Sequence, residues 1–103
     1  MIKNINTSDV LTFDDNTKFL VLYKITQFKK PYYLLIGVKN DDLDFNEIVY
    51  VTEDIDEEGN EYIEEVEDIE ILNKLTNYVL NNALNEFSSE VKDDLKEALN
   101  TNL

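Results

Sequence analysis

The sequence predicts an α+β domain in which an antiparallel meander of four to five strands is followed by one or two C-terminal helices packed on one face. Up to about residue 66, runs rich in β-branched and aromatic residues alternate with turn-forming residues, which is typical of strands. Beyond that point the apolar residues recur every three or four positions, which is typical of helices. With 103 residues, of which 43% are hydrophobic, we expect a single domain (1–103) divided into a sheet (10–66), a helix (68–87) and a tail helix (88–103).

The first part of the chain predicts a short strand and then a hairpin. Val10–Phe13 is the short strand, and the turn-forming residues Asp14-Asp15-Asn16 close it. Two longer strands follow at Thr17–Phe28 and Tyr32–Lys39. Because Pro31 has no backbone N–H to donate to a neighbouring strand, it belongs at the turn between them.

The segment Phe19 to Tyr23 is apolar at every position, so it offers apolar side chains to both faces of the sheet. Such a pattern predicts a strand that is covered on two sides. The sequence leaves two arrangements open. Both covers belong to the same domain, or a helix covers one face and a second subunit covers the other.

The second part of the sheet is expected to be acidic. Asn40–Asn46 reads as a polar loop with two apolar anchors, Leu43 and Phe45, and Glu47–Glu53 as a third long strand. Asp54–Gly59 is expected to turn the chain, with Gly59 supplying a positive φ. The strand that follows, 60–66, has acids on both faces, which fits an edge strand whose charges discourage pairing with another chain.

Asp68 is expected to cap the first helix, with Glu70 placed well for the helix dipole. The helix is predicted to end near Ser88, and Ser88 or Ser89 to cap a second helix. The apolar faces of the two helices are Leu72, Leu75, Val79, Ala83 and Phe87 for the first, and Val91, Leu95, Ala98 and Leu99 for the second.

Charge is distributed along the chain in blocks. Residues 41–70 contain fifteen carboxylates and no basic residue, whereas residues 17–40 contain five lysines and no acid. The formal net charge of the whole chain is −14. We therefore expect the chain to be repelled by nucleic acid and by anionic membranes, and to attract basic protein partners.

The residue types needed for most catalytic sites are missing. The chain has no His and no Cys, and its two glycines cannot form a phosphate-binding loop. We therefore expect no enzymatic activity and no cofactor. The absence of Cys fits a reducing compartment, and no stretch is apolar and long enough to span a membrane, so the expected location is cytoplasmic.

One motif resembles a metal site. Asp54, Asp56, Glu58 and Glu65 nearly match the ligand positions of a calcium loop, with Gly59 at its sharp turn. The fifth position holds Glu58 where Asp or Asn is usual, and the flanking residues predict strands instead of helices. An acidic hairpin turn explains the same residues, so we expect no metal site. If a metal ion were bound, these four residues would be its candidate ligands.

The order of elements resembles a family of small acidic proteins of low-GC Gram-positive bacteria, the YrzB-like proteins. The similar segments are Phe19–Val38 (FLVLYKITQFKKPYYLLIGV) and Glu47–Asp68 (EIVYVTEDIDEEGNEYIEEVED). The chain departs from the family pattern in its basic turn at Lys29–Pro31 and in its tail, Ser88–Leu103. The family has no established activity, so the resemblance implies a cytoplasmic, non-enzymatic protein and assigns no functional residue.

The function predicted from these observations is an interaction or regulatory module that presents a negative surface to a basic partner. Three alternatives stay open: a nucleic-acid mimic that inhibits a nucleic-acid-binding protein, a calcium-responsive domain, and a homo-oligomer with a structural role. No direct binding of nucleic acid or membrane is expected. The predicted partner-binding residues are Asp54, Asp56, Glu57, Glu58, Glu61, Glu64, Glu65 and Glu67.

Overall fold

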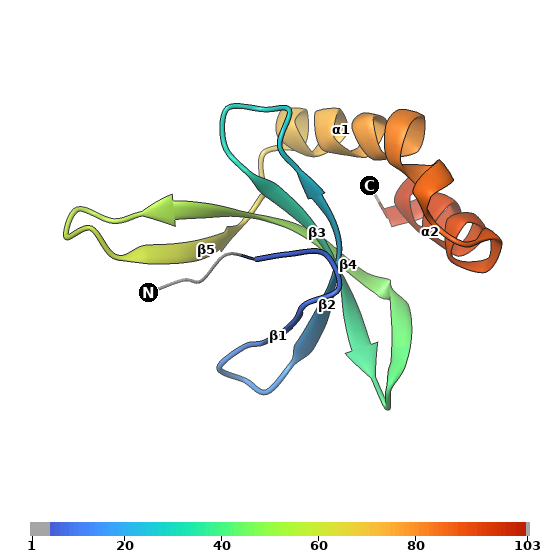
Figure 1. Ribbon diagram of the computed structural model, residues 1–103, viewed down its shortest axis with the longest axis horizontal. Coiled ribbons are helices and arrows are strands. Elements are labelled where there is room, and N and C mark those ends of the chain that lie inside the picture. Colours follow the sequence, from blue (N-terminus) through green and yellow to red (C-terminus); the bar gives the residue numbers. More distant parts are fainter. Residues whose placement is uncertain (1–4, 103) are drawn as a thin grey trace.

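The computed structural model describes residues 5–102, which form one twisted antiparallel sheet with the helices gathered on one of its faces (Figure 1). The strands follow one another as a meander in the order β1-β2-β3-β4-β5, so the predicted α+β class and meander are confirmed. In chain order the elements are β1 (Val10–Thr12), β2 (Lys18–Ile25), β3 (Tyr32–Lys39), β4 (Asp42–Ile55), β5 (Glu61–Glu65), α1 (Ile69–Tyr78), the π-helical turn η1 (Val79–Ala83), the 3₁₀ turn η2 (Leu84–Glu86) and α2 (Ser89–Asn102).

The loop predicted at Asn40–Asn46 is wrong, because β4 already begins at Asp42. Lys39 pairs with Asp42, so only Asn40 and Asp41 join the two strands, and both have positive φ (54° and 65°). Positive φ at both central residues is the geometry of a type I′ hairpin turn, which Asn and Asp tolerate well. The turn chemistry therefore ends the loop five residues earlier than its polarity suggested.

A bulge in β4 accounts for the polar residues that follow this turn. Ile36 pairs with Ile48 and Gly37 pairs with Asp44, so three residues of β4 have no partner in β3. A Cβ on Gly37 would lie 2.8 Å from the Cβ of Glu47, so the bulge fits only over a glycine. The two predicted apolar anchors of this segment, Leu43 and Phe45, pack against the main core.

The main core lies between the sheet and the helices. The sheet contributes the buried side chains of Leu34, Ile36 and Tyr50, and the helical segment contributes Leu75 and Leu95, among others. The hydroxyl groups of Tyr50 and Thr76 hydrogen-bond across this layer (3.2 Å), which joins β4 to α1. The predicted cap is confirmed, since the Asp68 carboxylate accepts from the N–H of Glu70 at 2.9 Å.

The opposite face of the sheet has a second, smaller core. It contains Val21, Tyr33, Leu35 and Val51, and Ile5 of the N-terminal segment is buried with them. That segment is fixed to β2, because the N–H of Ser8 donates to the carbonyl of Val21 and the N–H of Val21 donates to the carbonyl of Asp9 (both 2.8 Å). Of the two arrangements left open by the sequence, the structure has both covers within one chain.

The predicted long helix is present but is not regular. It runs as α1 to Tyr78, continues as η1 and η2 to Glu86, and the chain then enters α2. The side-chain amide of Asn82 donates to the carbonyl of Tyr78 (3.2 Å), an oxygen that the backbone N–H of residue 82 would bond in a regular α-helix. Within residues 5–102, no helix combines the length and the apolar character needed to cross a membrane.

Candidate functional site

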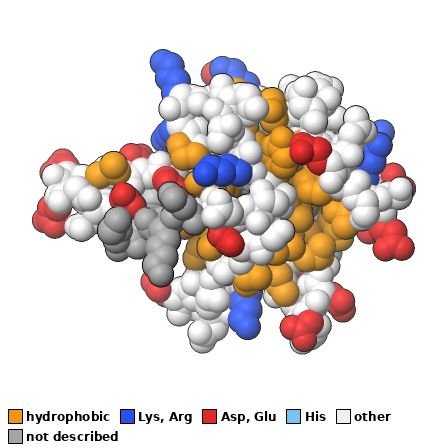
Figure 2. Space-filling model, in the orientation of Figure 1, with side chains coloured by type: hydrophobic (Ala, Val, Ile, Leu, Met, Phe, Trp, Pro, Cys, Tyr) orange, Lys and Arg blue, Asp and Glu red, His pale blue; other side chains and the backbone are white. Residues whose placement is uncertain are grey.

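The acidic residues singled out by the sequence gather on the outer part of the β4–β5 hairpin, residues 53–65, which we call the acidic arm. The arm projects from the body of the sheet (Figure 1), and acidic side chains cluster at its far end (Figure 2). β5 is the last strand of the sheet, as predicted for an edge strand. The tip of the arm therefore lies away from both hydrophobic cores, whereas Ile63 nearer its base packs against the smaller one.

The strand register places acids on both faces of the arm. Directly paired residues share a face, so one face contains the pairs Glu53–Ile63 and Ile55–Glu61, and the other contains the pair Asp54–Tyr62. Towards the base of the arm, Glu65 pairs with Val51 on the first face and Glu64 pairs with Thr52 on the second. Neither face is free of negative charge.

The turn at the tip is shaped by Asp56. Its carboxylate accepts from the backbone N–H of Asn60 (2.8 Å) and of Glu58 (2.9 Å), and Gly59 has the predicted positive φ of 85°. These hydrogen bonds, above all the one from Asn60, lower the pKa of Asp56. Asp56 therefore holds the turn in shape, while the neighbouring side chains of Glu57 and Glu58 are exposed.

The electrostatic field of the arm is negative and little neutralised. Among the residues that the structure describes, the ion pair found is Lys30 with Asp54, at 3.8 Å between two partly exposed side chains. The carboxylate of Asp54, followed by burial and by Glu64 and Asp56, raises the pKa of Tyr62. On the other face, the hydroxyl of Tyr33 donates to Glu53 (2.7 Å); burial, followed by this hydrogen bond and the charge of Glu53, raises the pKa of Tyr33.

Two apolar side chains stand exposed among these acids. Ile55 is 62% exposed and Tyr62 is 39% exposed, and they lie on opposite faces of the arm. The sequence prediction placed Ile55 in the turn Asp54–Gly59 and Tyr62 in the strand 60–66, and it gave neither side chain a role. No pattern in the sequence distinguishes them, because apolar residues beside a hairpin turn are equally compatible with an edge that another element covers.

Seven of the eight predicted partner-binding residues lie on the arm or in its turn. The eighth, Glu67, comes after β5 in the connection to α1, where it lines a groove together with Lys30 and Tyr32. The structure thus brings most of the predicted set onto one projecting element. The seven on the arm are Asp54, Asp56, Glu57, Glu58, Glu61, Glu64 and Glu65.

The candidate calcium ligands are not brought together. Asp54 and Glu65 lie on opposite faces of the hairpin, and the Asp56 carboxylate is already engaged by backbone N–H groups of the turn. Within residues 5–102, no group of three or more acidic side chains is arranged to hold a metal ion. The calcium-loop pattern is explained by the acidic hairpin turn.

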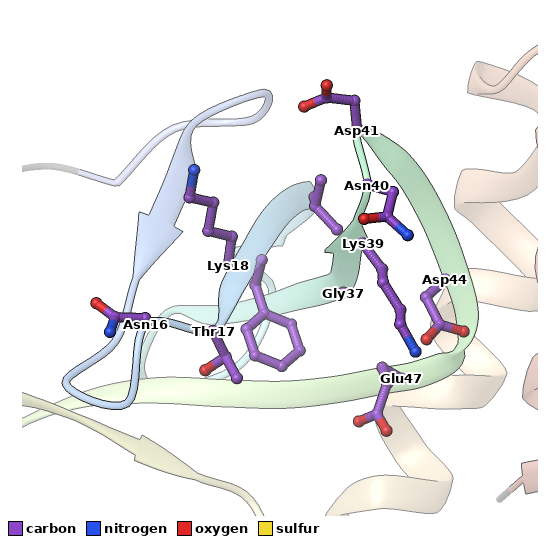
Figure 3. Close-up of a pocket in the computed structure, with 11 residues that line it drawn as sticks. Asn16, Thr17, Lys18, Gly37, Lys39, Asn40, Asp41, Asp44 and Glu47 are labelled. Carbon is purple, nitrogen blue, oxygen red and sulfur yellow. The ribbon is translucent and has the colours of Figure 1, made fainter.

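A cleft of about 600 Å³ lies at the other end of the sheet, beside the β4 bulge (Figure 3). Gly37 forms part of its floor, and Lys39 points towards Asp44 and Glu47. Charges of both signs face each other here. The lining residues do not include a nucleophile with a general base beside it. The sequence did not reveal this cleft, because it depends on the bulge and on the two-residue turn before β4.

In the comparisons with known proteins, no family model, no curated protein and no solved structure matches this chain. The resemblance to the YrzB-like proteins therefore stays a prediction.

Proposed function

We propose that this chain is a non-enzymatic interaction module whose acidic arm docks onto a basic surface of a partner protein. The observation that supports the proposal most is the exposure of Ile55 and Tyr62 among acids whose charge is little neutralised by nearby lysines. An acidic surface alone promotes solubility, but it gives no reason to expose a large aliphatic and an aromatic side chain on the same projecting element.

The two kinds of residue have different roles in such an interface. The carboxylates of the arm would steer a basic partner towards it and raise the association rate, in a way that weakens as salt rises. The apolar side chains would enter pockets of the partner and supply most of the binding energy, as buried aromatic and aliphatic anchors do in protein interfaces. We place this module in the cytoplasm, because a chain without Cys needs no oxidising compartment.

A nucleic-acid mimic is the second candidate function, and the acids on both faces of the arm favour it. Carboxylates that repeat along two paired strands resemble the regular charges of a nucleic-acid backbone. In that case the partner is a nucleic-acid-binding protein, and the arm occupies its binding groove.

The proposal is tested by capturing partners from a cell lysate at physiological salt with three versions of the chain. They are the wild type, the arm variant Ile55→Ser/Tyr62→Ser and the control variant Val10→Ser/Ile69→Ser, which removes exposed apolar side chains elsewhere. We expect a defined partner to be retained by the wild type and the control and lost by the arm variant. The same basic proteins bound to all three versions, and released together by salt, would show plain polyanion behaviour.

The same capture separates the two candidate functions. Duplex DNA added to the complex should release the partner if the arm mimics nucleic acid. Retention of the partner in excess DNA would exclude the mimic and leave the general interaction module.

A further inference from the structure

We propose that the pocket between α1 and the loop joining β2 to β3 binds a small aromatic or branched aliphatic carboxylate. The pocket has a volume of about 270 Å³, which is near the lower end for small-molecule sites and suits a single ring or a short branched chain. Its lining residues are Phe28, Lys29, Tyr32, Ile71, Lys74 and Leu75.

The apolar part of the pocket is built from side chains that already pack against one another. Tyr32 and Leu75 form its buried floor, at 7% and 0% exposure. The ring of Phe28 is held edge-on by Tyr32 (6.1 Å between ring centroids) and by Tyr78 (6.2 Å). Such contacts fix an aromatic wall before any ligand arrives, so little ordering is needed on binding.

The polar part of the pocket is positive in a chain that is otherwise strongly negative. Lys29 lies on the loop and Lys74 on α1, so each of the two elements contributes one exposed lysine to the lining of the pocket. Within residues 5–102 neither has a carboxylate within 4.0 Å of its ammonium group, although Glu70 lies one helical turn before Lys74. Two ammonium groups beside an apolar cavity are suited to a ligand with one apolar end and one anionic end.

A neighbouring groove sets the direction in which such a ligand would lie. This groove shares Tyr32 and Ile71 with the pocket, but its charged lining residues are one lysine, Lys30, and four acids, Glu64, Glu65, Glu67 and Asp68, so the groove is negative overall. Those four carboxylates repel an anion, so the carboxylate of the ligand is directed to the end with Lys29 and Lys74. The site is separate from the acidic arm in position and opposite to it in charge.

The test is an NMR titration of ¹⁵N-labelled protein with 3-phenylpropionate, and with 3-phenylpropan-1-ol as the uncharged control ligand. We expect saturable shifts at Phe28, Tyr32, Ile71 and Leu75, with the alcohol binding at least fivefold more weakly. The variant Lys29→Gln/Lys74→Gln should weaken binding of the carboxylate at least fivefold. The matched variant Lys18→Gln/Lys96→Gln, which removes the same charge elsewhere, should leave it unchanged.

Each contrary result would overturn the proposal. Non-saturable shifts, or shifts centred on the cleft with Lys18 and Lys39, would mean that the carboxylate does not bind in this pocket. Equal binding of acid and alcohol, or an unchanged affinity in the Lys29/Lys74 variant, would remove the role of the two lysines. If the same pocket residues shift when the protein alone is concentrated, a second copy occupies the pocket instead of a small carboxylate.

Discussion

The central part of strand β4 and its last residues lie in opposite environments. In the body of the sheet, Tyr50 and Val51 are buried on opposite faces, one under the helices and the other under the N-terminal segment. A few residues later, Ile55 and Asp56 are exposed in the acidic arm. One continuous strand therefore joins a region that is covered on both sides to a region that is covered on neither.

In the proposed function, the body of the sheet supplies the folding stability and the arm supplies the contact with a partner. Apolar burial is the dominant favourable term in folding, so the body, with its two cores, supplies the free energy that holds the chain together. The arm adds cross-strand pairs and a tight turn but little buried area, so it tolerates the repulsion among its acids. It follows that substitutions in the two regions should differ sharply in their effects.

The largest expected effect comes from a substitution in the main core. Leu34 is fully buried, so Leu34→Ala should lower the free energy of unfolding by about 3 kcal/mol through lost burial and the cavity left behind. Ile55→Ala is the matched change on the arm and should cost less than about 0.5 kcal/mol. Urea denaturation of both variants measures the two losses of stability. Similar losses would contradict the assignment of folding stability to the body of the sheet.

The next largest effect is expected at the bulge that joins the body to the turn before β4. Gly37→Ala places a Cβ 2.8 Å from the Cβ of Glu47, so it should destabilise the protein by about 2 kcal/mol through overpacking. The double variant Gly37→Ala/Glu47→Gly removes the atom that clashes and should recover part of this loss. No recovery in thermal or urea unfolding would mean that the backbone, and not Glu47, requires the glycine.

The body should also respond to alkaline pH. Burial raises the pKa of Tyr50 to about 12, above its ordinary value of 10, so the unfolded chain releases this proton first. The stability contributed by the neutral phenol is complete below pH 10 and is lost as the pH rises towards 12. Between pH 8 and pH 11 the loss from Tyr50 should be on the order of 1 kcal/mol.

The control for this pH effect is Tyr50→Phe, which is compared with the wild type by urea unfolding at both pH values. The variant has no phenol at this position, so its stability should fall less between pH 8 and pH 11. Equal losses in the two proteins would assign the alkaline sensitivity to other groups.

The smallest expected effect is that of salt on the arm. Repulsion among the acids of the arm is screened at higher ionic strength, so the Tm should rise by a few degrees between about 0.01 M and 0.2 M NaCl. Neutralising Glu57, Glu58, Glu61 and Glu64 to Gln should reduce this rise. A Tm that falls with added salt would show that attraction between the lysines of residues 17–40 and the acids of residues 41–70 dominates.

The sequence predicted the parts of the fold that depend on local chemistry. The hairpin around Pro31, the cap at Asp68 and the turn with Gly59 each follow from what one residue type can do in the backbone. The prediction of a loop at 40–46 was wrong. The polar residues of this segment suggested a loop, but they belong to strand β4, which continues through a bulge. That bulge depends on the meeting of Gly37 and Glu47, which are distant in sequence and come together only in the fold.

The candidate site, like the fold, was predicted only in part from the sequence. The run of acids can be read directly from the sequence. Its placement on a hairpin followed from Gly59 and the predicted strands on either side. The exposure of Ile55 and Tyr62 could not be predicted, since apolar residues at strand ends are equally compatible with a covered edge. The pocket with Lys29 and Lys74 was also hidden, because it needs the β2–β3 loop and α1 to lie side by side.

The measurement that tests the central claim most directly compares two variants of equal net charge for their capture of the partner at physiological salt. One neutralises four acids of the arm, Glu57, Glu58, Glu61 and Glu64, and the other neutralises four acids of α2, Glu90, Asp93, Asp94 and Glu97. Each changes the net charge from −14 to −10, because four negative charges are removed. We expect only the arm variant to lose the partner. Equal loss by both variants, or retention by both, would contradict it.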